Sequence, residues 1–229
     1  MIELTISEDD VTPEIIPEGI TKLTWNKKEP LPLLPKYLKY LSCNSVKELP
    51  DELPKGLVNL SCNEMINLPK LPNSLRFLYC KATITLPNVL PKKLKLLYCD
   101  SVITLPKVLP INLKSLACNK VKKLPVLPNS LVELICKSVT KLPNVLPNHL
   151  KILICNSAII LPKVLPERLI ILNCNSITEL PELPKRLIIL YCNSVTELPE
   201  LPESLKRLYC KSAIKLPNVL PKGLDIIKK

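Results

Sequence analysis

The stretch Tyr191–Cys210, YCNSVTELPELPESLKRLYC, starts and ends on the same Tyr-Cys dipeptide and contains two Leu-Pro pairs. Cysteine recurs along the chain in steps of 18 or 19 residues, at positions 43, 62, 80, 99, 118, 136, 155, 174, 192 and 210. Each unit has the form L-x-x-L-x-C-x-x-x-x-x-L-P-x-(x)-L-P-x-x-x, and the extra residue of the longer units lies between the two Leu-Pro pairs. Such a short, fixed period predicts a stack of coils that together bury one continuous core.

The repeat extends over essentially the whole chain. Two degenerate units precede the first cysteine and one partial unit follows the last; their pattern residues are Met1, Leu4 and Ile6, then Ile20, Leu23 and Trp25, and finally Leu224, Ile227 and Lys229. Of the 25 prolines, 24 fall into twelve pairs that follow the same period. We therefore predict a single solenoid over residues 1–229 with about 12 coils: degenerate coils at 1–37, regular coils at 38–223 and a partial coil at 224–229.

The length and composition of one unit predict its local structure. A period of 18 or 19 residues is too short for a strand, a full helix and their turns. The segment L-x-x-L-x-C is rich in leucine, isoleucine and tyrosine and alternates like a strand. Proline lacks a backbone N–H and disfavours the helical region in the residue before it, so the Leu-Pro pairs indicate extended or polyproline-II backbone. We expect a parallel sheet on one face, extended segments on the other, and little or no α-helix.

This pattern resembles the leucine-rich repeat family, and most closely its short class with L-P-x-L-P segments, which is found in bacterial effectors and in proteins of large DNA viruses and protists. Leu205, Leu208 and Cys210 correspond to the strand positions of that family, and Leu216-Pro217 to its convex segment. The resemblance implies a β-rich solenoid with the parallel sheet on its concave face. The family's asparagine in the turn after the strand is missing at its usual place. We expect a column of serines to bond that turn instead: Ser45, Ser101, Ser138, Ser157, Ser176, Ser194 and Ser212.

The cysteines are expected to fill the core. Leu208 and Cys210 point to one side of a strand while Arg207 and Tyr209 point to the other, so the cysteines of successive coils form a column. Cysteine is small and often buried. Disulfides between adjacent coils are an alternative, although each cysteine in a column has two equivalent neighbours. Metal binding and catalysis are weaker alternatives, because there is no C-x-x-C motif and His149 is the only histidine. We predict no catalytic residue, cofactor or metal.

Function is expected on the strand residues that face away from the core. An exposed group of apolar side chains commonly marks an interaction surface, although isoleucine and tyrosine also simply favour strands. We predict a non-enzymatic scaffold that binds an unidentified protein partner with the outward face of the sheet. The candidate residues are Phe77, Tyr79, Leu96, Tyr98, Ile135, Ile152, Ile154, Ile171, Ile189, Tyr191, Arg207 and Tyr209.

The positive charge is concentrated in the middle of the chain. Residues 65–160 hold 14 Lys and Arg and two acids, Asp100 and Glu133. The net charge of this segment therefore equals the net charge of +12 of the whole chain. The alternative function is therefore binding of nucleic acid or an acidic ligand through these coils, while a solvated lysine face is the simplest explanation. The basic belt comprises Arg76, Lys95, Lys114 and Lys151.

The ends of the chain suggest its compartment and one mode of association. The N-terminus MIELTISEDD has neither a basic region nor an apolar core of a signal peptide, and no apolar run is long enough for a membrane span. We expect a cytoplasmic protein, in host cytoplasm if it is viral. Related bacterial effectors join such repeats to a ubiquitin-ligase domain, which would need many further residues, so we expect no enzyme. A free strand edge at the N-terminus predicts an end-to-end homodimer.

Overall fold

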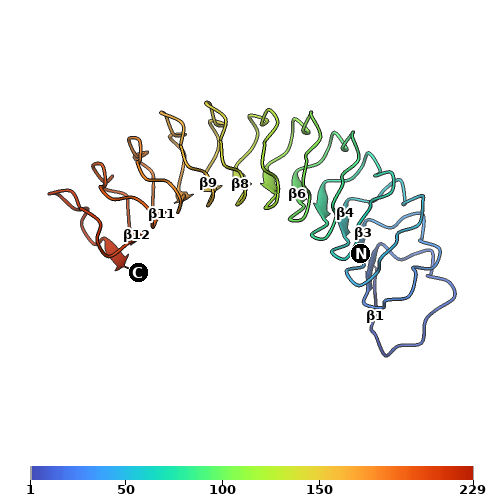
Figure 1. The fold of residues 1–229 in the computed structure, drawn as a ribbon. Helices are drawn as coiled ribbons and strands as arrows, with labels where there is room; N and C mark the ends of the chain where they lie inside the picture. The colour runs from blue at the N-terminus through green and yellow to red at the C-terminus, as the bar shows by residue number, and fades with distance from the viewer. Residues whose placement is uncertain (1, 229) are drawn as a thin grey trace. The chain divides into compact units, whose positions relative to one another are not determined.

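The computed structural model of the chain describes residues 2–228 (Figure 1). Met1 and Lys229, which we assigned to the first and last coils, lie outside the described residues. Nearly every L-x-x-L-x-C segment ends in a short strand. The strands are β1 (Glu3–Ile6), β2 (Lys22–Trp25), β3 (Tyr40–Ser42), β4 (Asn59–Ser61), β5 (Phe77–Tyr79), β6 (Leu96–Tyr98), β7 (Ser115–Ala117), β8 (Glu133–Ile135), β9 (Ile152–Ile154), β10 (Ile171–Asn173), β11 (Ile189–Cys192), β12 (Arg207–Cys210) and β13 (Asp225–Lys228).

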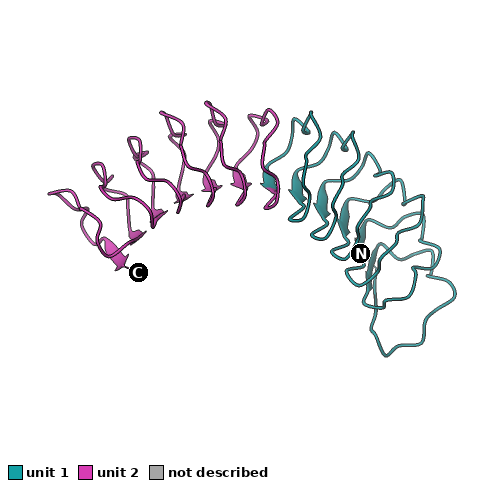
Figure 2. Cartoon of the chain, in the orientation of Figure 1, with its two compact units in different colours: residues 1–116 teal, residues 117–229 magenta. Residues whose placement is uncertain are grey.

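The chain forms two compact units, Met1–Leu116 and Ala117–Lys229 (Figure 2). In the first unit β1 to β6 pair in sequence order, and every pair is parallel. In the second unit β8 to β13 pair in the same way. Within each unit the strands lie along one side and the proline-bearing segments along the other. Each unit is thus a parallel β-solenoid, as predicted. Residues 2–228 contain no helix, and hence none long and apolar enough to cross a membrane.

Two tight turns close each coil. After the strand, the N–H of Val46 donates to the Cys43 carbonyl at 3.4 Å, and the same bond recurs three residues after most cysteines. Before the strand, the N–H of Leu57 donates to the Pro54 carbonyl at 2.9 Å, and this bond also recurs along the chain. A carbonyl that accepts from the third residue along is the signature of a β-turn. Two β-turns reverse the chain twice in a coil of 18 or 19 residues, which leaves no room for a helix.

The core consists of columns that run from coil to coil. The two leucines and the cysteine of the regular L-x-x-L-x-C segments are buried, as predicted. A further column, which we did not identify from the sequence, lies three residues after the cysteine and is apolar in most coils. Thr83 is its polar member; it is fully buried, and its Oγ1 donates to the Met65 carbonyl at 2.9 Å. The hydroxyl is tolerated there because the bond replaces the hydration that burial removes.

Trp25 takes the cysteine position in the second coil. Strand register places it opposite Ile6, and its neighbour Leu23 opposite Leu41 of the next coil. The ring is completely buried, and its Nε1 donates to the Glu29 carbonyl at 3.1 Å. An indole can be buried at little cost only where its N–H finds such a partner. The larger side chain therefore fills the core of a coil whose pattern is otherwise degenerate.

The last strand is shifted by one residue from the register that we expected. We aligned Leu224, Ile227 and Lys229 with the repeat, but the structure pairs Cys210 with Lys228 and Leu208 with Ile226. A shift of one residue turns each side chain to the opposite face of a strand. Ile226 and Ile227 are accordingly both half-buried. The shift is possible because Ile226 and Ile227 are adjacent, so either register places an isoleucine toward the core.

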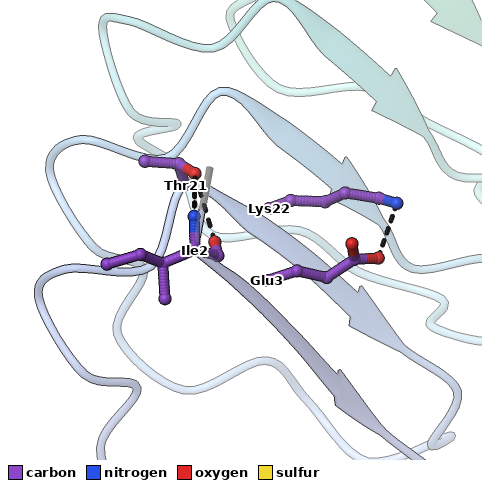
Figure 3. Close-up of polar contacts among 4 residues, drawn as sticks. All are labelled: Ile2, Glu3, Thr21 and Lys22. Atoms are coloured by element: carbon purple, nitrogen blue, oxygen red, sulfur yellow. Dashed lines mark hydrogen bonds and ion pairs between the residues drawn. The ribbon is translucent and has the colours of Figure 1, made fainter.

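The first strand is held by polar contacts to the second (Figure 3). Lys22 and Glu3 form an ion pair of 2.5 Å between directly paired positions of β1 and β2. Next to it, Thr21 Oγ1 accepts from the Ile2 N–H and donates to the Ile2 carbonyl, both at 3.1 Å. Both contacts are exposed, so each stabilises the strand pair only modestly.

Candidate partner-binding surface

The outward face of the strands carries the side chains that we predicted to bind a partner. In β9, Leu153 is completely buried while Ile152 and Ile154 on either side of it are half-exposed. The same alternation holds in nearly all strands from β3 to β12; in β7, Ala117 is also buried. The strands therefore place inward leucines in the core and leave the outward residues in contact with solvent. Parallel pairing then decides which of these outward residues are neighbours.

In the first unit the structure brings together four of the predicted partner-binding residues, Phe77, Tyr79, Leu96 and Tyr98, which we call the aromatic cluster. Phe77 lies opposite Leu96, and Tyr79 opposite Tyr98. The two tyrosine rings meet edge to face, with centroids 5.5 Å apart, which is a favourable geometry for an aromatic pair. Ser115 Oγ donates to the Tyr98 hydroxyl at 3.3 Å. The aromatic cluster is thus a continuous, half-exposed surface over β5 and β6.

In the second unit the isoleucines among the predicted partner-binding residues form two rows. Ile152, Ile171 and Ile189 lie opposite one another on β9, β10 and β11 and form the isoleucine row. In the other row Ile135 lies opposite Ile154. Asn173 follows Ile154 in that row and separates it from Tyr191. The repeat period already places Asn173 between these two residues, and the strand register agrees with it.

Beyond Asn173 the second row continues as a tyrosine pair. The rings of Tyr191 and Tyr209 are stacked, with centroids 4.2 Å apart and planes 8° apart. Partial desolvation and the neighbouring Tyr209 hydroxyl raise the pKa of Tyr191, so its hydroxyl is neutral at physiological pH. Arg207, the remaining candidate residue, lies opposite Ile189 at the end of the isoleucine row. A flat aromatic pair beside a guanidinium is a composition typical of protein interfaces.

The predicted basic belt is only partly continuous. Arg76, Lys95 and Lys114 are exposed, and a backbone hydrogen bond joins each to the next: Lys95 N–H to the Arg76 carbonyl at 2.8 Å, and Lys114 N–H to the Lys95 carbonyl at 2.7 Å. These three form a row in the first unit. In the second unit, Lys151 has Val132 and Ile170 at the equivalent positions of the adjacent coils. Lys151 is therefore a single charge between apolar residues.

The cysteines lie in the core and are chemically inactive there. All ten are buried, and the Sγ of Cys174 donates to the Tyr191 carbonyl of the next coil at 3.5 Å. Burial raises the pKa of Cys43 and of Cys155 to about 12. Because the thiolate is the reactive and metal-binding form, such thiols are poor nucleophiles and poor ligands. Within residues 2–228 no three His, Cys, Asp or Glu side chains are grouped so as to hold a metal ion.

Asparagines, which we did not single out from the sequence, bond the turn after the strand in several coils. Asn44 Oδ1 accepts from the Asn63 N–H of the next coil at 3.3 Å, and Asn63 Oδ1 accepts from the Lys81 N–H at 3.4 Å. In the second unit Asn175 Oδ1 accepts from the Asn193 N–H at 3.3 Å. The residue directly after the cysteine thus connects neighbouring coils. A short side chain with a carbonyl group suits this position because it reaches the backbone N–H of the equivalent turn in the next coil.

A second exposed apolar surface was missed in the sequence. It lies on the proline side, at the residue directly before the second Leu-Pro pair. This residue is a strongly exposed valine in five successive coils: Val89, Val108, Val126, Val145 and Val164. We had treated this place only as the site of length variation. The recurrence of valine at a position outside the core pattern is the signal that could have identified the surface.

No protein-family model matches the sequence, and no curated protein matches it either. Solved structures do match. YopM from Yersinia enterocolitica is 29% identical, covering 93% of this chain and 51% of its own, with a TM-score of 0.80. The chain thus spans about half of that protein's length. YopM from Yersinia pestis, described as a leucine-rich effector protein, is 23% identical over 99% of this chain and 88% of its own, with a TM-score of 0.60.

A third similar structure is the functional domain of InlJ from Listeria monocytogenes, which is described as including a cysteine ladder. It is 22% identical, covers 92% of this chain and 58% of its own, and has a TM-score of 0.69. At this identity the likeness concerns the fold alone. The buried cysteine column is present in this chain independently of that comparison.

Proposed function

Because this chain is a leucine-rich-repeat protein, we propose that it is a non-enzymatic scaffold that binds a partner protein through the outward face of its strands. The observation that carries this proposal is the isoleucine row of the second unit. Ile152, Ile171 and Ile189 are half-exposed, although alternation leaves these positions free to be polar. Adjacent Tyr191 and Tyr209 supply the aromatic area that interface centres favour.

The test is a comparison of three forms of the tagged full chain in pull-down from cells. In Ile152→Asp/Ile171→Asp, two charges replace the centre of the isoleucine row, and we expect recovery of the partner to be lost. The matched control is Val219→Asp, which places the same charge on an exposed apolar residue of the proline side in the same unit. Circular dichroism checks that both variants are folded. Equal recovery by all three forms would exclude the isoleucine row as the binding surface.

The protonation and the burial of the reactive side chains support the non-enzymatic part of the proposal. Burial raises the pKa of the thiols of Cys80 and Cys192 to about 12, so they cannot act as nucleophiles without exposure of the core. His149 is exposed and is the only histidine of the chain. An acid–base pair built on histidine would need a partner in an ordered pocket. We accordingly propose no catalytic residue.

A second candidate function is the binding of nucleic acid or another polyanion to the first unit. The row of Arg76, Lys95 and Lys114 favours it, because three exposed cations in adjacent coils lie beside the aromatic cluster. Binding through such a row should weaken steeply with salt. We expect an Arg76→Ala/Lys95→Ala variant to bind a labelled single-stranded RNA less tightly and with a shallower salt dependence. Partner recovery that is unchanged between low and moderate salt would favour the isoleucine row instead.

We also propose a reducing, cytoplasmic location and an end-to-end homodimer. Free, buried thiols such as those of Cys43 and Cys155 are compatible with a reducing compartment. The outer edge of β1 is the surface that would pair in the homodimer. Thr5→Pro would place a residue without a backbone N–H in that strand. Light scattering at low protein concentration, where only the pairing through β1 is tested, should then show the dimer replaced by monomer. A dimer that persists in this variant would contradict pairing through β1.

A further inference from the structure

The valines on the proline side of the second unit have no role in packing. Val126, Val145 and Val164 are 88%, 80% and 79% exposed. In later coils of the same unit the equivalent position, directly before the second Leu-Pro pair, holds Glu182 and Glu200. The coil therefore forms equally well with a carboxylate at this place. Three successive strongly exposed valines consequently need another explanation than the fold.

The valines line two adjoining grooves between successive coils. A groove of about 880 Å³ lies between Val145 and Val164, and Ile160, itself 70% exposed, contributes to its wall. The next groove, of about 850 Å³, lies between Val126 and Val145. Val145 is common to both, so the two grooves form one surface, which we call the valine groove. A contiguous exposed apolar groove is a candidate binding site.

Positive charge surrounds the valine groove. Lys122, Lys123 and Lys141 line its first part. Lys163 and Arg168 line its second part, where Glu167 is the acidic residue. An apolar floor with a basic rim selects a ligand that combines apolar side chains with carboxylates, because a neutral apolar segment would leave the rim uncompensated.

Residues 8–18 of the first unit, EDDVTPEIIPE, have this composition. They contain five acidic residues and no lysine or arginine. Val11 and Ile15 are 91% and 73% exposed, so the segment presents two apolar side chains between its carboxylates. Pro13 and Pro17 restrict the segment to turn or extended conformations, which lowers the entropy lost on binding. No other part of residues 2–228 combines this density of acids with strongly exposed apolar residues.

We propose that the valine groove binds residues 8–18 of a second copy of this chain. The two surfaces are different, so the contact is heterologous: each copy offers one groove and one acidic segment. Such contacts either close, as a reciprocal dimer or a ring, or extend into open chains. This association is independent of the proposed function, because it uses the proline side and leaves the outward face of the strands accessible.

The direct test uses a fluorescein-labelled synthetic peptide of residues 7–18 and fluorescence anisotropy with the full chain. We expect binding that weakens with salt, since exposed charges are screened. Val145→Glu/Val164→Glu should weaken binding at least about tenfold. Glutamate is native at the equivalent positions 182 and 200, so the variant should fold. The control Val219→Glu changes the same position beside a groove that Glu197, Glu200 and Glu203 line. Equal affinity of both variants would overturn the proposal.

Two further measurements separate the proposal from its alternatives. A scrambled peptide of equal composition should bind at least about tenfold more weakly; equal binding would reduce the effect to unspecific charge attraction and overturn the proposal. In light scattering, the full chain should assemble with increasing concentration, and Val11→Ser/Ile15→Ser should reduce this assembly. A chain that stays monomeric at concentrations where the peptide binds would overturn the assignment to a second copy. Ile152→Asp/Ile171→Asp should leave peptide binding unchanged, so failure of the proposed function can be recognised separately.

Discussion

Cysteine serves in this chain as a small apolar residue. Each coil leaves room for one small side chain beside its two buried leucines, and Trp25 shows what happens when the coil is degenerate: a much larger side chain takes the place and finds its own hydrogen-bond acceptor. The thiol fills this space without requiring a strong partner. The protonated state of the thiol at neutral pH therefore follows from its burial. The evenly spaced cysteines of the sequence are most informative about packing, and the half-exposed residues between them about binding.

The raised thiol pKa values predict a loss of stability in alkaline solution. The pKa of Cys43, Cys80 and Cys155 rises from 9.0 to about 12 on folding. Above pH 9 the unfolded chain releases these protons while the folded chain retains them, so the free energy of unfolding falls between pH 9 and pH 12. We expect about 2 kcal/mol per thiol at pH 10.5. Urea midpoints at pH 8 and pH 10.5 measure this loss, and Cys43→Ala/Cys155→Ala should reduce it. Equal midpoints would contradict it.

Removal of the Trp25 ring should strongly destabilise the N-terminal coils. The side chain is fully buried, so Trp25→Ala leaves a cavity that neighbouring coils cannot fill, and we expect a cost of about 3–5 kcal/mol. Urea unfolding followed by circular dichroism measures it. Tyr37→Ala is the control, because Tyr37 is also aromatic but exposed. A similar small effect of both substitutions would mean that the N-terminal coils do not depend on this ring.

At the scale of the element, the coil tolerates variation on one side only. The strand side is constrained by alternation, since each leucine must return to the core. The proline side is not: coils of 18 and 19 residues follow one another, and the residue that distinguishes them lies in the exposed turn between the Leu-Pro pairs. The terminal strand β13 illustrates the opposite case. Its two adjacent isoleucines, Ile226 and Ile227, fit either register, and its pairing is shifted by one residue.

Deletion of one residue should therefore have opposite effects on the two sides of a coil. Without Val164, the segment LPKVLP becomes LPKLP, which occurs natively at residues 68–72. We expect the change in the free energy of unfolding to stay below about 1 kcal/mol. Ile171 lies between the two buried leucines of one segment. Its deletion turns one of these leucines outward, so it should cost about 3 kcal/mol or more. Thermal unfolding of the two variants provides the comparison. Equal losses would contradict this view of the coil.

At the scale of the whole molecule, positive charge is in excess. The chain has 32 basic and 20 acidic residues, and the excess belongs to residues 65–160. The ion pairs Lys22–Glu3 and Lys215–Glu197 are exposed and lie outside that range. Self-repulsion among the middle lysines is therefore the main electrostatic effect on stability.

Moderate salt should accordingly stabilise the chain. Screening weakens the repulsion in the middle coils more than it weakens two exposed ion pairs, which are worth little. We expect the Tm to rise by a few degrees between about 10 mM and 150 mM NaCl. The charge-reducing variant Lys92→Ser/Lys93→Ser, at two exposed residues of one turn, should show a smaller rise. A Tm that falls with salt would indicate that attractive charge contacts dominate instead.

The sequence alone determined the period, the strand positions, the inward leucine and cysteine columns, and the extended proline segments. These follow from short-range physics: alternation in a strand, the restrictions of proline, and the need of each coil to share its core with the next. The period also placed equivalent residues of successive coils side by side, including Asn173 between Ile154 and Tyr191. Only the tertiary structure decided how the side chains of such neighbours meet: Tyr191 and Tyr209 stack, and the exposed valines line grooves. The reason is that side-chain geometry and the shape of a groove depend on how the coils pack, which no residue's own sequence context specifies.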